Sequence, residues 1–97
     1  MTTGGDTVLV VEDEAPMRRF LTAALHSHGF RVIEASTLAV AEKLATEHVP
    51  SAILLDLGLP DGDGLTLLKS FRSAKLALWD QVSHRLISFR EAAAMAA

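Results

Sequence analysis

Apolar residues follow two kinds of pattern in the first two thirds of this chain. Residues 7–11, 30–35 and 52–55 are predicted to be short strands, and the first of them is an apolar run without alternation, which is typical of a strand that is covered on both faces. Between these runs, apolar residues recur at helical spacing. Alternation of this kind predicts an α/β fold with right-handed crossovers, a doubly wound parallel sheet of strand order 2-1-3 and helices on both faces.

Two helices are predicted between the strands. The first begins near Pro16, because proline suits the first turn of a helix, and it ends at Gly29. The second is capped by Ser36 or Thr37 and ends before Pro50. Their apolar members are Met17, Phe20, Leu21, Ala24 and Leu25 in the first helix, and Leu38, Ala41, Leu44 and Ala45 in the second.

The rest of the chain divides into two parts. A third helix is expected from Asp63 or Gly64, which completes a β-α-β-α-β-α unit over residues 1–72. Residues 73–97 have a different character, and their apolar residues fit a helix, so we predict a helical tail. The stripe in this tail consists of Trp79, Val82, Leu86, Phe89 and Ala93.

Composition narrows the function. The 97 residues are enough for one domain, the net charge is -3, and no Lys/Arg-rich stripe is present, which argues against direct binding of nucleic acid. The chain has no cysteine and therefore no disulfide or thiolate metal site. It shows neither a secretory leader nor an apolar run of membrane-spanning length, so we expect no membrane contact and a cytoplasmic location.

Acidic residues follow two of the predicted strands. Glu12 and Asp13 come directly after the first strand, and Asp56 ends the third. Because the carboxyl ends of parallel strands share one edge of the sheet, these acids are expected to meet there. Carboxylates of this kind are ligands for Mg²⁺, and with the metal bound Asp56 becomes a plausible nucleophile toward phosphorus. Gly58 would let the backbone pass close to the metal.

The same residues carry a resemblance to a family. Residues 8–14 (VLVVEDE) and 55–64 (LDLGLPDGDG) resemble the receiver domain of bacterial two-component response regulators, with a flavodoxin-like fold, and the second motif looks closest to the Kdp-type regulators of the winged-helix class. The resemblance covers residues 7 to about 72. It implies that Asp56 accepts phosphate from a sensor histidine kinase. It also implies that Asp13, Asp56 and the Gly58 carbonyl hold Mg²⁺ directly and Glu12 through water, in a protein linked to transcription.

The tail departs from the family pattern. A receiver is expected to continue with a strand ending in Ser or Thr and another ending in Lys, and neither is recognisable, since Lys69 and Lys75 stand in the wrong place. We therefore expect a receiver truncated after the third helix, without its switch residues. One explanation is a reading-frame shift, because codons that encode residues 83–88 can read Val-Ile-Val-Leu-Ser-Ala when shifted by one base.

Each acidic motif also has a simpler interpretation. Glu12, Asp13 and Glu14 could simply be acids that favour the positive end of the next helix dipole. Asp56 could be a turn residue. Residues 61–64 are best interpreted as turn and capping residues, and Leu65 excludes a calcium loop. The histidines at positions 26, 28, 48 and 84 are read as solvated side chains.

Four functions remain open. The first is a phosphoacceptor module, at most a self-catalysed phosphoryl transfer to Asp56. The second is a non-switching module that binds a kinase as a decoy or pairs with a second copy. A phosphatase is disfavoured, because position 58 is Gly and not the second Asp that this chemistry uses. The fourth is a truncated product without function, whose uncovered third strand would favour aggregation.

Overall fold

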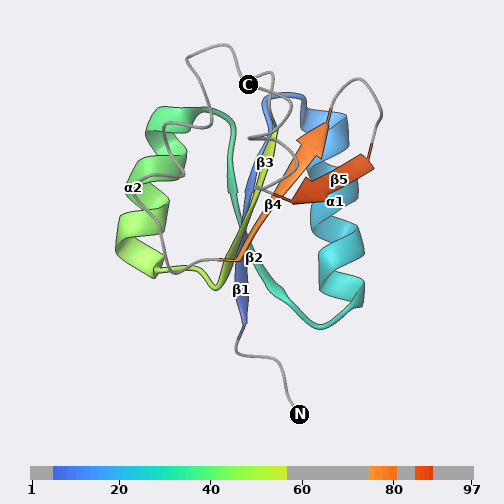
Figure 1. The fold of residues 1–97 in the computed structure, drawn as a ribbon, viewed down its shortest axis with the longest axis horizontal. Coiled ribbons are helices and arrows are strands. Elements are labelled where there is room, and N and C mark those ends of the chain that lie inside the picture. Colours follow the sequence, from blue (N-terminus) through green and yellow to red (C-terminus); the bar gives the residue numbers. More distant parts are fainter. Residues whose placement is uncertain (1–5, 57–74, 81–84, 89–97) are drawn as a thin grey trace.

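The computed structural model describes residues 6–56, 75–80 and 85–88. They form five strands and two helices, whose arrangement is shown in Figure 1. The elements are β1 (Thr7–Val11), α1 (Ala15–Ser27), β2 (Arg31–Ala35), α2 (Leu38–His48), β3 (Ala52–Asp56), β4 (Lys75–Asp80) and β5 (Arg85–Ser88).

The strands form one sheet in the order β2-β1-β3-β4-β5. The first four strands are parallel, and β5 runs antiparallel to β4 (Figure 1). The predicted α/β class and the order 2-1-3 of the first three strands are therefore confirmed. The register aligns Val11 with both Ala35 and Leu55, so the carboxyl ends of β1, β2 and β3 lie level at one edge of the sheet.

Local signals in the sequence fix the helix ends. Pro16 lies in the first turn of α1, where its missing N–H costs no intrahelical hydrogen bond. Thr37 caps α2, and its Oγ1 accepts a hydrogen bond of 3.2 Å from the Val40 amide. Gly29 follows α1 with a φ of 88°, a conformation that glycine adopts without a steric penalty. Val49 ends α2 with a φ of 45°, which is unfavourable for a β-branched residue.

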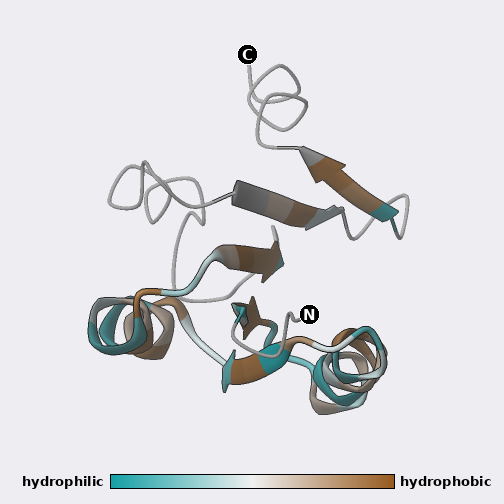
Figure 2. Ribbon diagram, turned by 90° about the horizontal axis from the view of Figure 1, so that it is seen from below, coloured by the Kyte–Doolittle hydropathy of each residue, from teal (hydrophilic) through white to brown (hydrophobic). Residues whose placement is uncertain are grey.

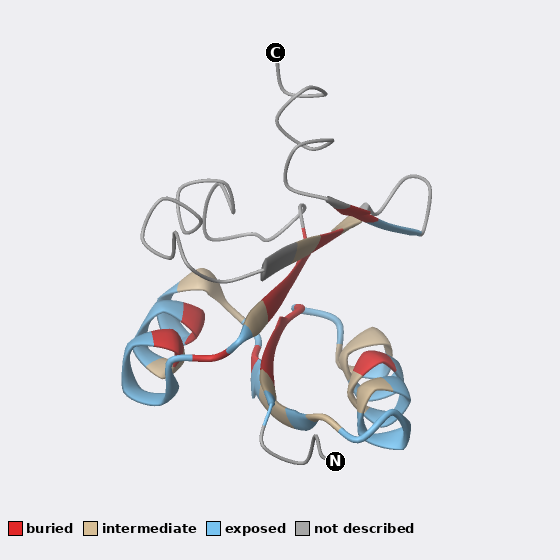
Figure 3. Ribbon diagram, turned by 60° about the horizontal axis from the view of Figure 1, so that its bottom comes forward, coloured by how far each residue is buried: buried red, intermediate tan, exposed pale blue. Residues whose placement is uncertain are grey.

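Side chains on the two faces of the sheet form two separate cores. On one face, Leu9, Ile53, Leu55 and Leu78 pack with Ala41 and Ala45 of α2. On the other face, Val8, Val10 and Leu54 pack with Leu21 of α1. Figure 2 shows the two helices on opposite sides of the first strands, and Figure 3 shows that the strands between them are largely buried. Each helix thus covers one face of the sheet.

The predicted helical tail is wrong for the two tail segments that the structure describes. Residues 75–80 and 85–88 form strands, so the described part of the chain contributes five strands to the sheet and not three. The edge of β3 presents unpaired backbone N–H and C=O groups, and pairing with β4 satisfies them, which outweighs a helical spacing of apolar residues. Trp79 and Leu86 accordingly lie on paired strands and not on one helical stripe.

Phe20 is a second departure from the predicted pattern. Phe20 is 63% exposed, whereas Met17, Leu21 and Leu25 of α1 pack against the sheet as expected. The predicted third helix and the loop from Gly58 to Gly64 lie outside the described residues. Within the described ranges, neither helix has the length and apolar character that crossing a membrane would require.

Candidate functional site

Two strand ends bring three carboxylates together. Glu12 follows β1 and Asp56 ends β3, one residue beyond the aligned pair Val11 and Leu55. One carboxylate oxygen from each of Glu12, Asp13 and Asp56 lies within 4.8 Å of the others. Glu12 and Asp56 are each only 1% exposed, while Asp13 is exposed. The structure therefore places the three predicted acids in one cluster at the carboxyl edge of the sheet.

Glu12 is held by several hydrogen bonds. Its backbone N–H donates to the Ala35 carbonyl at 3.0 Å, which ties the end of β1 to the end of β2. Its carboxylate Oε2 accepts a hydrogen bond of 3.1 Å from the Glu14 amide. This second bond turns the carboxylate back toward its own loop and beside Asp56.

Burial and the neighbouring acids raise the pKa of Glu12 to about 8. Burial is the largest cause, because removal from water disfavours the charged form. A hydrogen bond and charge repulsion with Asp56 add to it, and the Glu14 amide acts in the opposite direction. The cluster is therefore costly to ionise fully unless a cation compensates its charge.

The donor set fits a hard divalent cation. Magnesium takes oxygen ligands and is commonly bound through one or two carboxylates, with water and phosphate oxygens completing the shell. Asp13 is exposed and can admit such ligands, whereas Asp56 and Glu12 supply oxygens at a fixed, buried position. Burial is the main reason that the pKa of Glu12 is raised, and the same cation would favour the ionised carboxylate and offset the smaller contribution of repulsion from Asp56.

Arg18 is a residue of this region that the sequence reasoning missed. Its Nη1 donates to the Glu12 carbonyl at 2.9 Å, and its Nε donates to Glu34 Oε1 at 3.2 Å. A signal was present in the sequence, because a cation in the first turns of a helix opposes the helix dipole and suggests another partner. Glu34 lies near the end of β2, so α1 and β2 are joined beside the cluster.

Trp79 is the second residue that was missed. It is aligned with Asp56 across the β3–β4 pair and belongs to the α1-face core, as does the aligned pair Leu54 and Ala77 two residues earlier. The indole and the Asp56 carboxylate therefore project from the same face on neighbouring strands. Lys75 is aligned with Ala52 at the opposite end of the pair, roughly 13 Å along the strand at about 3.3 Å per residue.

The remaining predicted site residues are placed as follows. Gly58 and residues 61–64 lie outside the described residues, as does His84. His26, His28 and His48 are exposed, in agreement with their reading as solvated side chains. His28 Nδ1 lies 2.9 Å from the Ala24 carbonyl at the end of α1, which makes it a helix-end contact.

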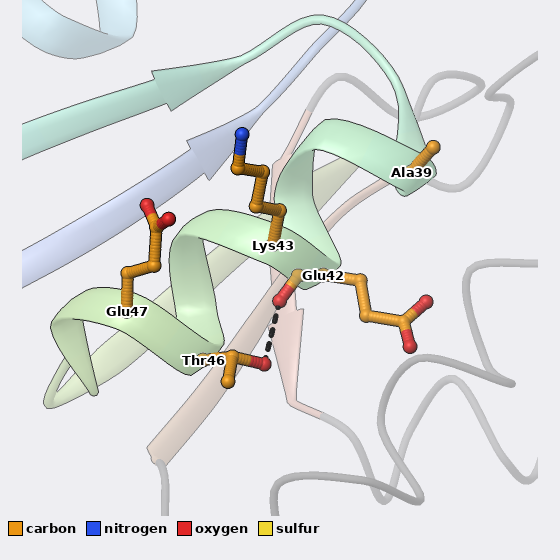
Figure 4. Close-up of a pocket in the computed structure, with 5 residues that line it drawn as sticks. All are labelled: Ala39, Glu42, Lys43, Thr46 and Glu47. Atoms are coloured by element: carbon orange, nitrogen blue, oxygen red, sulfur yellow. Dashed lines mark hydrogen bonds between the residues drawn. The ribbon is translucent and has the colours of Figure 1, made fainter.

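A surface depression on α2 offers no comparable chemistry. Its volume is about 420 Å³, and it lies over the outer surface of α2 (Figure 4). Thr46 Oγ1 donates to the Glu42 carbonyl at 2.9 Å, a bond within the helix. The described residues that line it are Ala39, Glu42, Lys43, Thr46 and Glu47.

Comparison with known proteins agrees with this arrangement. The family model of the response regulator receiver domain matches residues 8–96. The chain is 45% identical over 83 residues to the KDP operon transcriptional regulatory protein KdpE of Escherichia coli, covering 86% of this chain and 35% of that protein. It is 42% identical over 71 residues to the virulence transcriptional regulatory protein PhoP of Salmonella typhimurium, covering 73% of this chain and 32% of the relative.

Solved structures give the same result. The receiver domain of the hybrid histidine kinase CckA matches with a TM-score of 0.68 at 31% identity, covering 74% of this chain and 72% of that one. The receiver domain of HemR from Leptospira biflexa matches with a TM-score of 0.68 at 30% identity, covering 75% and 62%. The chain spans about a third of the length of the curated relatives it matches. With the family model matching most of its residues, this chain belongs to the response regulator receiver domain family.

Proposed function

We propose that this chain accepts a phosphoryl group on Asp56 in a two-component signalling pathway. The observation that carries the proposal is the buried pair of Glu12 and Asp56 with Asp13 beside them, at the carboxyl edge of a parallel sheet. Membership in the receiver family supports the same role. The donor would be the phosphohistidine of a sensor histidine kinase.

The residues of the chain divide the work between them. An Asp56 carboxylate oxygen attacks phosphorus, the P–N bond to the donor imidazole breaks, and its electron pair stays on the nitrogen. Asp13, Asp56 and the Gly58 carbonyl would hold Mg²⁺, with Glu12 acting through water, and the cation would neutralise charge on the phosphoryl oxygens. Because Asp56 is buried at the end of β3, its carboxylate has less rotational freedom than an exposed side chain, which would favour a productive orientation for attack.

Direct labelling tests this proposal. The purified chain is incubated with phosphoramidate and Mg²⁺, and intact mass spectrometry detects the added phosphoryl group. We expect labelling of the wild type, no labelling of Asp56→Asn and no labelling when EDTA removes the metal. Labelling that persisted in Asp56→Asn would show that Asp56 is not the acceptor. The exposed residue Asp6 provides a matched control, and Asp6→Asn is expected to label as the wild type does.

A second function is favoured by the end of β4. At the position of β4 that is aligned with Asp56, the chain carries the indole of Trp79, and Lys75 is aligned with Ala52 at the opposite end of the pair. A bulky indole aligned with the acceptor supports a module that binds a kinase or a second copy without switching. Labelling of Asp56 without any change in the Trp79 fluorescence or in the mass measured by light scattering would favour this function.

The origin of the tail over residues 73–97 can be tested by sequencing the coding DNA. Sequencing the coding region from codon 70 onward shows whether a one-base shift opens a frame that reads Val-Ile-Val-Leu-Ser-Ala over residues 83–88. Such a frame would make the tail a frameshift product, and an unchanged frame would make β4 and β5 genuine parts of this protein.

Regulation of transcription, a homodimer and a cytoplasmic location belong to the same proposal, by analogy with relatives that are transcriptional regulatory proteins.

A further inference from the structure

Both backbone groups of Glu12 are held by neighbouring elements. Its N–H donates to the Ala35 carbonyl of β2, and its carbonyl accepts a hydrogen bond from Arg18 of α1. With the peptide groups on both sides fixed, the direction in which the Glu12 side chain leaves the backbone is fixed as well. The Arg18 side chain therefore holds the Glu12 carbonyl, and the end of the β1–β2 pair holds the Glu12 N–H.

Glu34 in turn orients Arg18. The guanidinium is a planar fork, and here one nitrogen contacts the Glu12 carbonyl while Nε contacts the Glu34 carboxylate at 3.2 Å. The side chains of Arg18 and Glu34 are 22% and 40% exposed, so this ion pair is screened by solvent and contributes little to stability. Its geometric effect is larger, because it limits the rotamers from which Arg18 can reach the Glu12 carbonyl.

We propose that Arg18, held by Glu34, is a positioning residue for the acidic cluster: it fixes the Glu12 backbone, so that the Glu12 carboxylate faces Asp56 with its Oε2 bonded to the Glu14 amide. This inference rests on the proposed function, since it assigns Arg18 a role at the same metal site. Arg18 contacts the Glu12 carbonyl and acts on the metal through Glu12. Residues that orient metal ligands in this way typically contribute about 10- to 100-fold to metal affinity.

Variants of three residues test the proposal. Mg²⁺ affinity is measured by calorimetry for wild type, Arg18→Ala, Arg18→Lys, Glu34→Gln and Arg19→Ala. Arg19 is the matched control, because it is adjacent, exposed and equally charged. We expect Arg18→Ala to weaken Mg²⁺ binding about 10-fold or more. Lysine restores the charge but lacks the fork, so Arg18→Lys should recover only part of the affinity. Glu34→Gln should lose less than Arg18→Ala, and Arg19→Ala should stay within about 2-fold of wild type.

A second measurement is made without metal. Amide hydrogen exchange of Glu14 reports the hydrogen bond to Glu12 Oε2, and we expect it to be several-fold faster in Arg18→Ala and unchanged in Arg19→Ala. Unchanged exchange in Arg18→Ala would overturn the positioning role, whether or not Mg²⁺ binds. So would equal losses of Mg²⁺ affinity in Arg18→Ala and Arg19→Ala, which would indicate a general charge effect. A wild type that fails to bind Mg²⁺ would overturn the proposed metal site, and the exchange measurement would still decide the role of Arg18.

Discussion

The two faces of the sheet bury different kinds of side chain. The face under α2 buries an aliphatic core that includes Leu9, Leu55 and Leu78. The face under α1 buries Val10 and Leu54, and the same alternation continues to Glu12 and Asp56 at the strand ends. Because side chains alternate along a strand, a shift of one residue in these two strands would have turned the acids toward α2. Both faces therefore contribute an apolar core, and the buried acids lie on the α1 face alone.

This division explains how a small domain can carry a costly site. Two buried carboxylates close together oppose folding unless one is protonated or a cation is bound. The aliphatic core on the other face is independent of that charge and can offset its cost. Changes on the α2 face should therefore alter stability without altering metal affinity. Changes at the acidic cluster should alter both stability and metal affinity.

The largest effect is expected from the α2 face. Leu55 is fully buried, and Leu55→Ala should lower the free energy of unfolding by about 2–5 kcal/mol through lost burial and a new cavity. Urea unfolding followed by circular dichroism measures this change. Calorimetry on the folded variant should give the wild-type Mg²⁺ affinity. A loss of Mg²⁺ affinity larger than the unfolded population of the variant can explain would contradict the independence of the two faces.

The next effect is the pH dependence of the metal-free protein. The pKa of Glu12 is raised from 4.5 to about 8, so between these values the folded state binds a proton that the unfolded state has released. The contribution of Glu12 protonation to the free energy of unfolding is therefore fully present below about pH 4.5 and is lost as the pH rises through about 8. The slope for one proton is at most about 1.4 kcal/mol per pH unit.

Two comparisons sharpen the pH measurement. Asp56→Asn removes one source of repulsion and should flatten the slope, and saturating Mg²⁺ should do the same in the wild type by favouring ionised Glu12. Urea unfolding at several pH values in EDTA measures the slope. Metal-free stability that rose steadily from pH 5 to 8 would contradict the raised pKa of Glu12.

The smallest effect concerns the end of α2. Val49 has a φ of 45° and is 77% exposed, so burial does not offset the cost of its left-handed conformation. Val49→Gly should raise the free energy of unfolding by about 0.5–1 kcal/mol, whereas Val49→Ala keeps the Cβ and should gain less. Thermal unfolding measures both variants. Equal gains from glycine and alanine would show that the Cβ is not the source of the strain.

Much of the fold was predictable because local signals and the hydrophobic pattern agree up to Asp56. Pro16, Thr37 and Gly29 mark helix ends by their own chemistry, and the structure confirms each of them. The acids at the ends of β1 and β3 were predictable as a cluster because parallel strands in register bring their carboxyl ends level. Arg18 was not predictable as their neighbour, since its contact depends on how α1 is tilted against β1.

The sequence by itself determined the alternation of strands and helices through residue 56 and the position of the acids at the strand ends. The tertiary structure decided the rest, because residues 75–80 become a strand where the open edge of β3 supplies hydrogen-bonding partners, and residues 85–88 pair in turn with β4. It also decided that Trp79 is aligned with Asp56 and that Phe20 faces solvent. Periodicity is a local property of a segment, whereas strand pairing and the packing angle of a helix depend on residues far away in the chain.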